Sequence, residues 1–219
     1  MLPPPSRWPF SAFALIAANL VPLVGVLTNH WSVFLVLLLY WSENVVVGAF
    51  NVLRMAYADP QVPVMWFAKL FFIPFFTVHY GIFTLVHGMF VVTLFGGHQY
   101  DRANLFSVSG MLHVVRTAGI GYAVAFLVVS HGFSFIHNYI ASGEYLRVDL
   151  KGLMTQPYAR IVVLHITTLI GGALATAAGA PLMAVVVLVL LKTAVDLQAH
   201  LAERTRLAAA AALPDSVLS

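Results

Sequence analysis

The segment Met183–Leu191 reads MAVVVLVLL, nine apolar residues in succession. Across the 219-residue chain 61% of residues are hydrophobic and 9% are charged, whereas a soluble domain carries about 25% charged residues. The chain has too few polar side chains to cover the surface of a water-soluble fold. The environment that suits this composition is a lipid bilayer. Lipid requires that backbone polar groups be satisfied internally, which leaves helices or a closed barrel. Unbroken apolar runs exclude the alternating pattern of a barrel and predict an all-α, polytopic transmembrane helix bundle.

A membrane-crossing helix needs about 20 mostly apolar residues. Six stretches qualify, namely residues 9–28, 31–55, 64–95, 117–140, 157–178 and 180–204. The third is long for one span, so Pro74 could kink it or its first turns could lie along the interface. We expect a short surface helix within the connection 96–116 and a flexible tail over residues 205–219. The sequence thus predicts one transmembrane domain of about six spans.

The positive charges are unequally divided between the two sides of this arrangement. The side of the N-terminus holds Arg7, Arg54, Lys69, Arg147, Lys151, Arg160, Arg204 and Arg206. The other side holds only Arg102 and Arg116. Because Lys and Arg concentrate on the cytoplasmic side, both termini are predicted to be cytoplasmic. Charges scattered near helix ends do not favour nucleic-acid binding. The absence of cysteine from the sequence excludes disulfides and thiolate metal ligands.

Five predicted spans place an ionisable side chain in the inner half or the middle of the membrane, where such a group is costly unless paired or hydrated. These residues are Glu43, His79, His131, His165 and Asp196. At about 1.5 Å per residue, they lie roughly 12–20 Å from the cytoplasmic ends of their spans. On the last span Lys192, Asp196 and His200 follow at i, i+4 and i+8 and share one face. We therefore expect a polar pocket that opens toward the cytoplasm.

Two or three imidazoles with a carboxylate suit zinc, iron or manganese. The predicted metal ligands are His79, His131, His165, Asp196 and His200. Glu43 and Lys192 are the predicted catalytic residues, with Glu43 as a general base or a further ligand. The predicted supporting side chains are Asn44, Asn51, Tyr80, His87, Ser134 and Asn138. This set predicts a metal-binding membrane protein that could be an enzyme acting on a lipophilic substrate, with membrane lipid as a partner.

Other interpretations use the same residues. They could form a proton relay in a proton-coupled carrier, for which a homodimer could supply a second half. They could bind haem b between two histidines chosen from His87, His131 and His165. They could also form only a structural network that holds the helices together, in which Lys192 pairs with Asp196 or Glu43.

Four short patterns resemble one family. They are Trp41-Ser-Glu-Asn44, His79-Tyr-Gly81 with His87-Gly88, Ser130-His131 with Ser134-Phe135, and Pro157-Tyr158 with Arg160-Ile161 and His165. Over about residues 40–200 the chain resembles an uncharacterised family of prokaryotic polytopic membrane proteins, a domain of unknown function. The resemblance implies a multi-pass protein of the inner (plasma) membrane. It implies no activity and no set of ligands.

Overall fold

The computed structural model describes residues 20, 23–28, 31–59, 63–100, 103–146, 150–155, 157–178 and 182–211. Among these, the side chains of residues 64, 168, 171–176, 178, 184, 196 and 199–211 fall outside the description. The described backbone is helical and contains no strand. The predicted all-α class is therefore confirmed for this part of the chain, while most of the predicted span 9–28 lies outside it.

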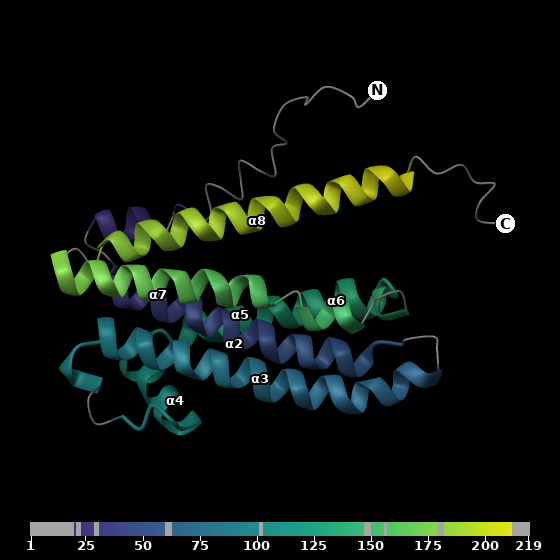
Figure 1. Cartoon of the computed structure of the whole chain (residues 1–219), viewed down its shortest axis with the longest axis horizontal. Coiled ribbons are helices and arrows are strands. Elements are labelled where there is room, and N and C mark those ends of the chain that lie inside the picture. The colour runs from purple at the N-terminus through teal and green to yellow at the C-terminus, as the bar shows by residue number, and fades with distance from the viewer. Residues whose placement is uncertain are drawn as a thin grey trace.

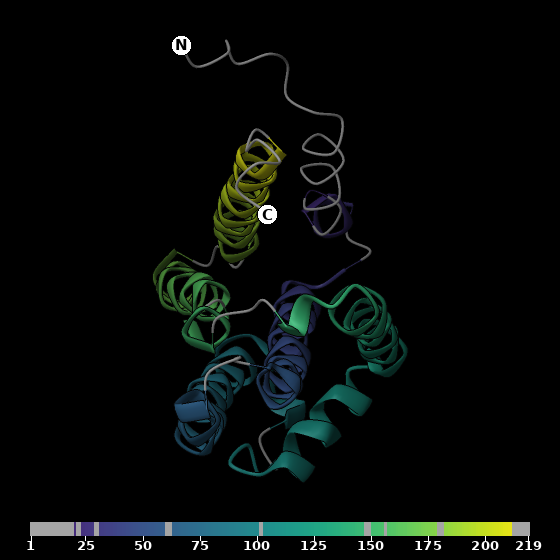
Figure 2. The same cartoon turned by 90° about the vertical axis from the view of Figure 1, so that its right-hand side faces the viewer.

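Long helices lie side by side along the long axis of the molecule (Figure 1), and α2 lies at the centre when the bundle is viewed from its end (Figure 2). The helices are α2 (Val33–Tyr57), α3 (Pro63–Phe95), α4 (Val108–Thr117), α5 (Gly121–Ser134), α6 (Leu150–Thr155), α7 (Tyr158–Ala178) and α8 (Leu182–Ala211). A π-helix, η2 (Phe135–Ala141), directly continues α5. Short 3₁₀ turns are η1 (His98–Tyr100) and η3 (Glu144–Leu146).

Three described helical stretches are long and apolar enough to cross a membrane, namely Val33–Tyr57, Met65–Phe95 and Gly121–Ala141. A shorter apolar stretch covers Val185–Val195. On α5 and η2 an outward stripe consists of Tyr122, Phe126, Val129, Phe133 and Ile136, with exposed fractions between 64% and 93%. A continuous exposed apolar stripe is unfavourable in water and is typical of a surface that contacts lipid. Six spans and two cytoplasmic termini remain predictions.

The connection 96–116 agrees with the sequence prediction, whereas the C-terminal tail agrees with it only in part. The expected surface helix within 96–116 is present as α4, and the Ser107 hydroxyl caps it by accepting a hydrogen bond from the Gly110 amide at 3.1 Å. Gly119 follows with φ +74°, a left-handed conformation that suits glycine at the turn into α5. At the other end of the chain, α8 continues to Ala211 and includes the first residues of the predicted tail, because alanine strongly favours helix.

The α2–α3 interface is built from two aromatic residues that each cover a glycine of the other helix. Trp41 of α2 lies against Gly88 of α3, and its indole N–H donates a 2.7 Å hydrogen bond to the Thr84 carbonyl. Tyr80 of α3 lies against Gly48 of α2, and its hydroxyl donates a 3.1 Å bond to a backbone carbonyl of α2. Small residues let two helices approach closely within a membrane. This pairing fixes how α2 and α3 are rotated about their axes, and therefore where their polar residues point.

Candidate functional site

A partly buried ion pair joins α2 and α7. An Arg160 guanidinium nitrogen donates to the Glu43 carboxylate at 2.6 Å, and Lys192 of α8 lies 4.0 Å from the other carboxylate oxygen. The Lys192 ammonium also lies 5.4 Å from the centre of the Tyr40 ring. The two residues predicted to be catalytic, Glu43 and Lys192, are thus neighbours. The closest cation to Glu43 is Arg160, which contributes to the positive-side count in the sequence analysis and is absent from the predicted site.

A histidine pair joins α3 and α7. Nε2 of His87 lies 2.8 Å from Nδ1 of His165, and Nδ1 of His87 lies 2.6 Å from the Phe83 carbonyl oxygen. His87 is 2% exposed, so almost all of its surface is removed from the surroundings. The sequence analysis assigned His165 as a metal ligand and His87 as a supporting residue, and the structure brings these two into direct contact.

The other predicted histidines have different neighbours. Nδ1 of His79 lies 2.7 Å from the Tyr158 hydroxyl, and the His79 ring stacks on Phe75. The His131 ring stacks on Phe50 of α2, with 6.2 Å between the ring centres. Within the side chains that the structure describes, no three His, Asp or Glu residues lie close enough together to hold one metal ion. Asp196 and His200 belong to α8, but their side chains lie outside the description, so the predicted five-ligand set remains a prediction.

The residues predicted to support the site form hydrogen bonds from their side chains, mostly to backbone carbonyls. Asn51 donates a 2.8 Å hydrogen bond to the Leu153 carbonyl and so attaches α6 to α2. Asn138 donates to the Ser134 hydroxyl at 3.2 Å across one helical turn. Asn44 is fully buried and donates at 3.0 Å to a carbonyl of its own helix, but its side-chain oxygen has no hydrogen-bond partner. Since a buried unpartnered acceptor is costly, Asn44 is a point where the described part of the bundle is not fully satisfied.

A polar cavity of about 240 Å³ lies between α2, the end of α5 and the start of α7. Its lining residues are Val47, Phe50, Asn51, Arg54, His131, Ser134, Pro157 and Arg160. The polar members of this lining are two guanidinium groups, an imidazole, an amide and a hydroxyl. We refer to it below as the polar cavity.

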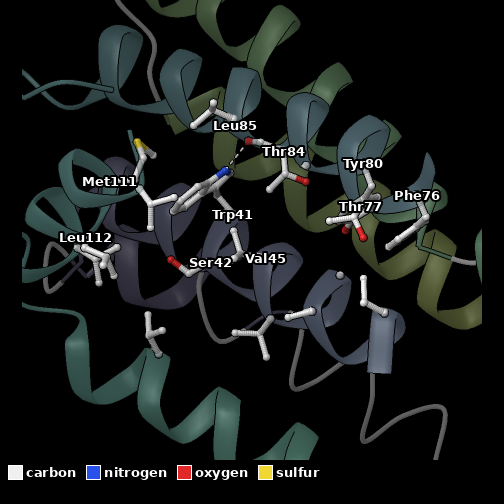
Figure 3. A pocket seen from close by; sticks show the side chains of 18 residues that line it. Trp41, Ser42, Val45, Phe76, Thr77, Tyr80, Thr84, Leu85, Met111 and Leu112 are labelled. Carbon is white, nitrogen blue, oxygen red and sulfur yellow. Dashed lines mark hydrogen bonds between the residues drawn. The ribbon is translucent and has the colours of Figure 1, made fainter. Parts of the chain in front are cut away.

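A larger, apolar cavity of about 410 Å³ lies on another face of α2, toward α3 and α4 (Figure 3). Its lining includes Trp41, Val45, Phe76, Leu85 and Met111. A few hydroxyl groups, such as that of Thr84, interrupt an otherwise hydrocarbon wall. The Thr84 hydroxyl is buried and has no hydrogen-bond partner. This cavity, below called the apolar cavity, is chemically suited to a lipophilic molecule.

One protein family matches nearly the whole of this chain. The model of a family of unknown function, DUF6498, matches residues 1–213. The chain belongs to the DUF6498 family. The match extends beyond both ends of the region of about residues 40–200 that carries the sequence resemblance, and it bears out an uncharacterised family. Neither the curated proteins nor the solved structures include a match to this chain.

This DUF6498 member also has polar residues that the sequence analysis did not select for the site. Tyr158 and Arg160, in the first turn of α7, bind His79 and Glu43. Lys69 is 6% exposed and donates hydrogen bonds of 2.6 and 2.8 Å to the last carbonyls of α2, where a cation is favoured by the helix dipole. Tyrosine and arginine at a helix start are common membrane-interface anchors, so the sequence offered no signal that these two reach inward.

Proposed function

We propose that this DUF6498 member is a multi-pass integral membrane protein of the prokaryotic inner membrane that binds a transition-metal ion, namely zinc, iron or manganese. His87 and His165 are two of the ligands in this proposal. The observation that carries it is the 2.8 Å contact between the two imidazole nitrogens, which come from different helices. Two histidines that converge at membrane depth are costly in hydrocarbon, and they are a common basis for a zinc or iron site.

The hydrogen bond to Phe83 supports a ligand role for His87. A carbonyl oxygen can only accept, so Nδ1 of His87 carries the proton that is donated to it. In a neutral imidazole the lone pair is then on Nε2, the nitrogen that faces His165. Metal-binding histidines characteristically donate their second ring N–H to a carbonyl or carboxylate, which fixes the tautomer and the ring orientation. His87 has this arrangement.

The distance between the two rings is compatible with a shared ion after a small movement. Two nitrogens that bind one zinc ion at about 2.0–2.1 Å in tetrahedral geometry lie roughly 3.3 Å apart. The observed separation of 2.8 Å would have to increase by about half an ångström. Binding would also displace the proton that now lies between the rings, because a metal ligand must offer its lone pair.

Asp196 of α8, the second helix of the α7–α8 hairpin, is the third ligand in this proposal. His165 lies 13 residues before the end of α7 at Ala178, and Asp196 lies 14 residues after the start of α8 at Leu182. The two helices lie side by side and run in opposite directions (Figure 1). The Glu43 carboxylate contacts both Arg160 of α7 and Lys192 of α8, so these two residues lie at about the same level. Asp196 lies one helical turn beyond Lys192, and its carboxylate would complete a His₂Asp set if it reached the histidine pair.

The same geometry favours a metal over the two alternatives. A proton relay through His87 would have to pass its Nδ1 proton to the next group, but that group is a backbone carbonyl, which cannot carry the proton further. Haem b needs its two axial ligands on opposite faces of the porphyrin, and nitrogens 2.8 Å apart leave no room for the macrocycle, so His87 and His165 cannot be the two axial ligands in this arrangement. A lipophilic substrate would suit the apolar cavity, and whether the protein is an enzyme or a homodimer stays a prediction.

The test is the metal content of the protein purified in detergent and equilibrated with zinc, iron and manganese in separate samples before extensive dialysis. The wild type should retain about one equivalent of one metal, and His87→Gln should retain at most about a tenth of that. His113→Gln, which replaces an exposed histidine of α4, should behave as the wild type. Asp196→Asn tests the third ligand. Retention of metal by a well-folded His87→Gln, His165→Gln double variant would exclude the proposal.

A further inference from the structure

The polar cavity has a charge balance that the metal proposal does not use. Among the lining residues that the structure describes there is no carboxylate, while Arg54, Arg160 and His131 all contribute nitrogen donors. Glu43 neutralises part of the Arg160 charge from outside the lining, through one guanidinium nitrogen. Among the described residues around this cavity, with His131 neutral, Arg54 and Arg160 stand against Glu43, which leaves a net positive charge in this described set. A partly enclosed cavity of this charge attracts an anion.

The charge of Arg54 is held at this cavity without being neutralised. Its guanidinium carbon lies 5.4 Å from the centre of the Tyr139 ring, a cation–π contact that orients the side chain and leaves its N–H donors in place. The Tyr139 hydroxyl donates a 2.7 Å bond to the Arg54 carbonyl, so both ends of the residue are fixed. Tyr139 itself is 0% exposed and therefore rigidly placed. Among the described residues, Arg54 forms no ion pair.

Hydrogen-bond donors of other kinds complete the lining. The Ser134 hydroxyl accepts a bond from Asn138, so its own O–H is available to donate. Ser134 is the last residue of α5, directly before the π-helix η2, and π-helical segments are frequent at functional sites. The set of two guanidiniums, one imidazole and one hydroxyl matches the several acceptor oxygens of a tetrahedral oxyanion.

We propose that the polar cavity binds a phosphate group, either that of an anionic lipid head group or that of a free phosphate compound, with Arg54, Arg160 and Ser134 as its contacts. A water molecule takes about 30 Å³ in the liquid, so a cavity of about 240 Å³ has room for a phosphate. Arg54 is three residues from the end of α2 at Tyr57, or about 4.5 Å along the helix axis. This is the end of the bundle at which lipid phosphates would lie.

The experiment uses the full chain purified in dodecyl maltoside, with inorganic phosphate and phosphatidylglycerol as separate probes. Inorganic phosphate is titrated at constant ionic strength against chloride, and its dissociation constant is taken from the shift in melting temperature. Phosphatidylglycerol in the micelles is compared with dioleoylglycerol, which lacks the phosphate, and bound lipid is counted by native mass spectrometry. The test variant is Arg54→Gln, and Arg116→Gln on the exposed face of α4 is the charge-matched control.

We expect at least one probe to bind the wild type saturably, and Arg54→Gln to weaken that probe tenfold or more while Arg116→Gln changes it less than twofold. Inorganic phosphate as the responsive probe identifies a soluble ligand, and phosphatidylglycerol alone identifies a lipid head group. Ser134→Ala, which leaves the Arg54–Tyr139 contact intact, should weaken the same probe about threefold and replaces Arg54→Gln if that variant does not fold. The absence of saturable binding by the wild type, or equal losses in the Arg54 and Arg116 variants, overturns the proposal.

Discussion

Replacing Gly88 with alanine should destabilise the bundle, whereas the same substitution at Gly81 should not. Both glycines belong to α3, seven residues apart. A Cβ atom added at Gly88 would lie 2.6 Å from two atoms of the Trp41 indole and 2.7 Å from the terminal methyl of Met111. A Cβ atom added at Gly81 would meet no atom within 4 Å. The two variants therefore make the same chemical change in the same helix. They differ in whether the added methyl group meets a side chain of α2.

The magnitude follows from three contributions. Alanine in place of a helical glycine stabilises by about 0.5–1 kcal/mol at either position. At Gly88 the added methyl group overpacks the interface, which costs about 1–3 kcal/mol. The Trp41 ring cannot move away without stretching its 2.7 Å hydrogen bond to the Thr84 carbonyl, which adds about 1 kcal/mol. The free energy of unfolding of Gly88→Ala should therefore lie about 2–4 kcal/mol below that of Gly81→Ala.

The measurement is reversible unfolding in mixed micelles with increasing dodecyl sulfate, followed by far-ultraviolet circular dichroism. This readout avoids indole fluorescence, which the Gly88 variant would change directly through Trp41. Gly81→Ala should unfold at the same or a higher dodecyl sulfate fraction than the wild type. If Gly88→Ala proves as stable as Gly81→Ala, the close approach of α2 and α3 at Trp41 is not present in the folded protein, and the rotation of both helices would have to be reconsidered.

Three further substitutions test the polar contacts by the same unfolding measurement. Glu43→Gln should lower the free energy of unfolding by about 2–4 kcal/mol because it removes the carboxylate that lies 2.6 Å from Arg160, and the Glu43→Gln, Arg160→Gln double variant should regain part of that loss. Purely additive losses would contradict a direct pair. Lys69→Met should cost about 1–3 kcal/mol and speed amide hydrogen exchange in the last turn of α2, and unchanged exchange there would count against the cap. Tyr139→Phe should cost about 1 kcal/mol because the Arg54 carbonyl loses the Tyr139 hydroxyl and keeps only the Ala58 amide as a donor, and a neutral result would refute the Tyr139 hydrogen bond.

The helices could be predicted from the sequence because the signal for a membrane-crossing helix is local. The predicted spans 31–55 and 64–95 differ from α2 and α3 by at most two residues at either end. A long apolar run determines its own helix, whichever neighbours it has. The π-helix η2 could not be predicted in this way, because its extra residue per turn is fixed by contacts such as that of Tyr139 with α2.

The partners of the histidines could not be predicted. The spacing of residues along one helix shows which side chains share a face of that helix, but it does not show which neighbouring helix packs against that face. The prediction gave His165 the role of a metal ligand and His87 only a supporting role. In the structure these residues are in contact, and so are His79 and Tyr158. Separate helices do bring costly polar groups together among the described side chains, as the Arg160–Glu43–Lys192 cluster and the histidine pair. Among those side chains, no three His, Asp or Glu residues could hold one metal ion.

The source of this difference is the level at which α7 begins. Tyr158, the first residue of α7, contacts His79, which lies 16 residues after the start of α3. At about 1.5 Å per residue, α7 therefore begins roughly 24 Å further along the bundle axis than α3 does. Depths counted from the start of each predicted span assume a common level, so they placed His165 too near the level at which α3 begins. The late start of α7 brings Arg160 to Glu43 and His165 to His87, and any metal or anion chemistry of this protein depends on that offset.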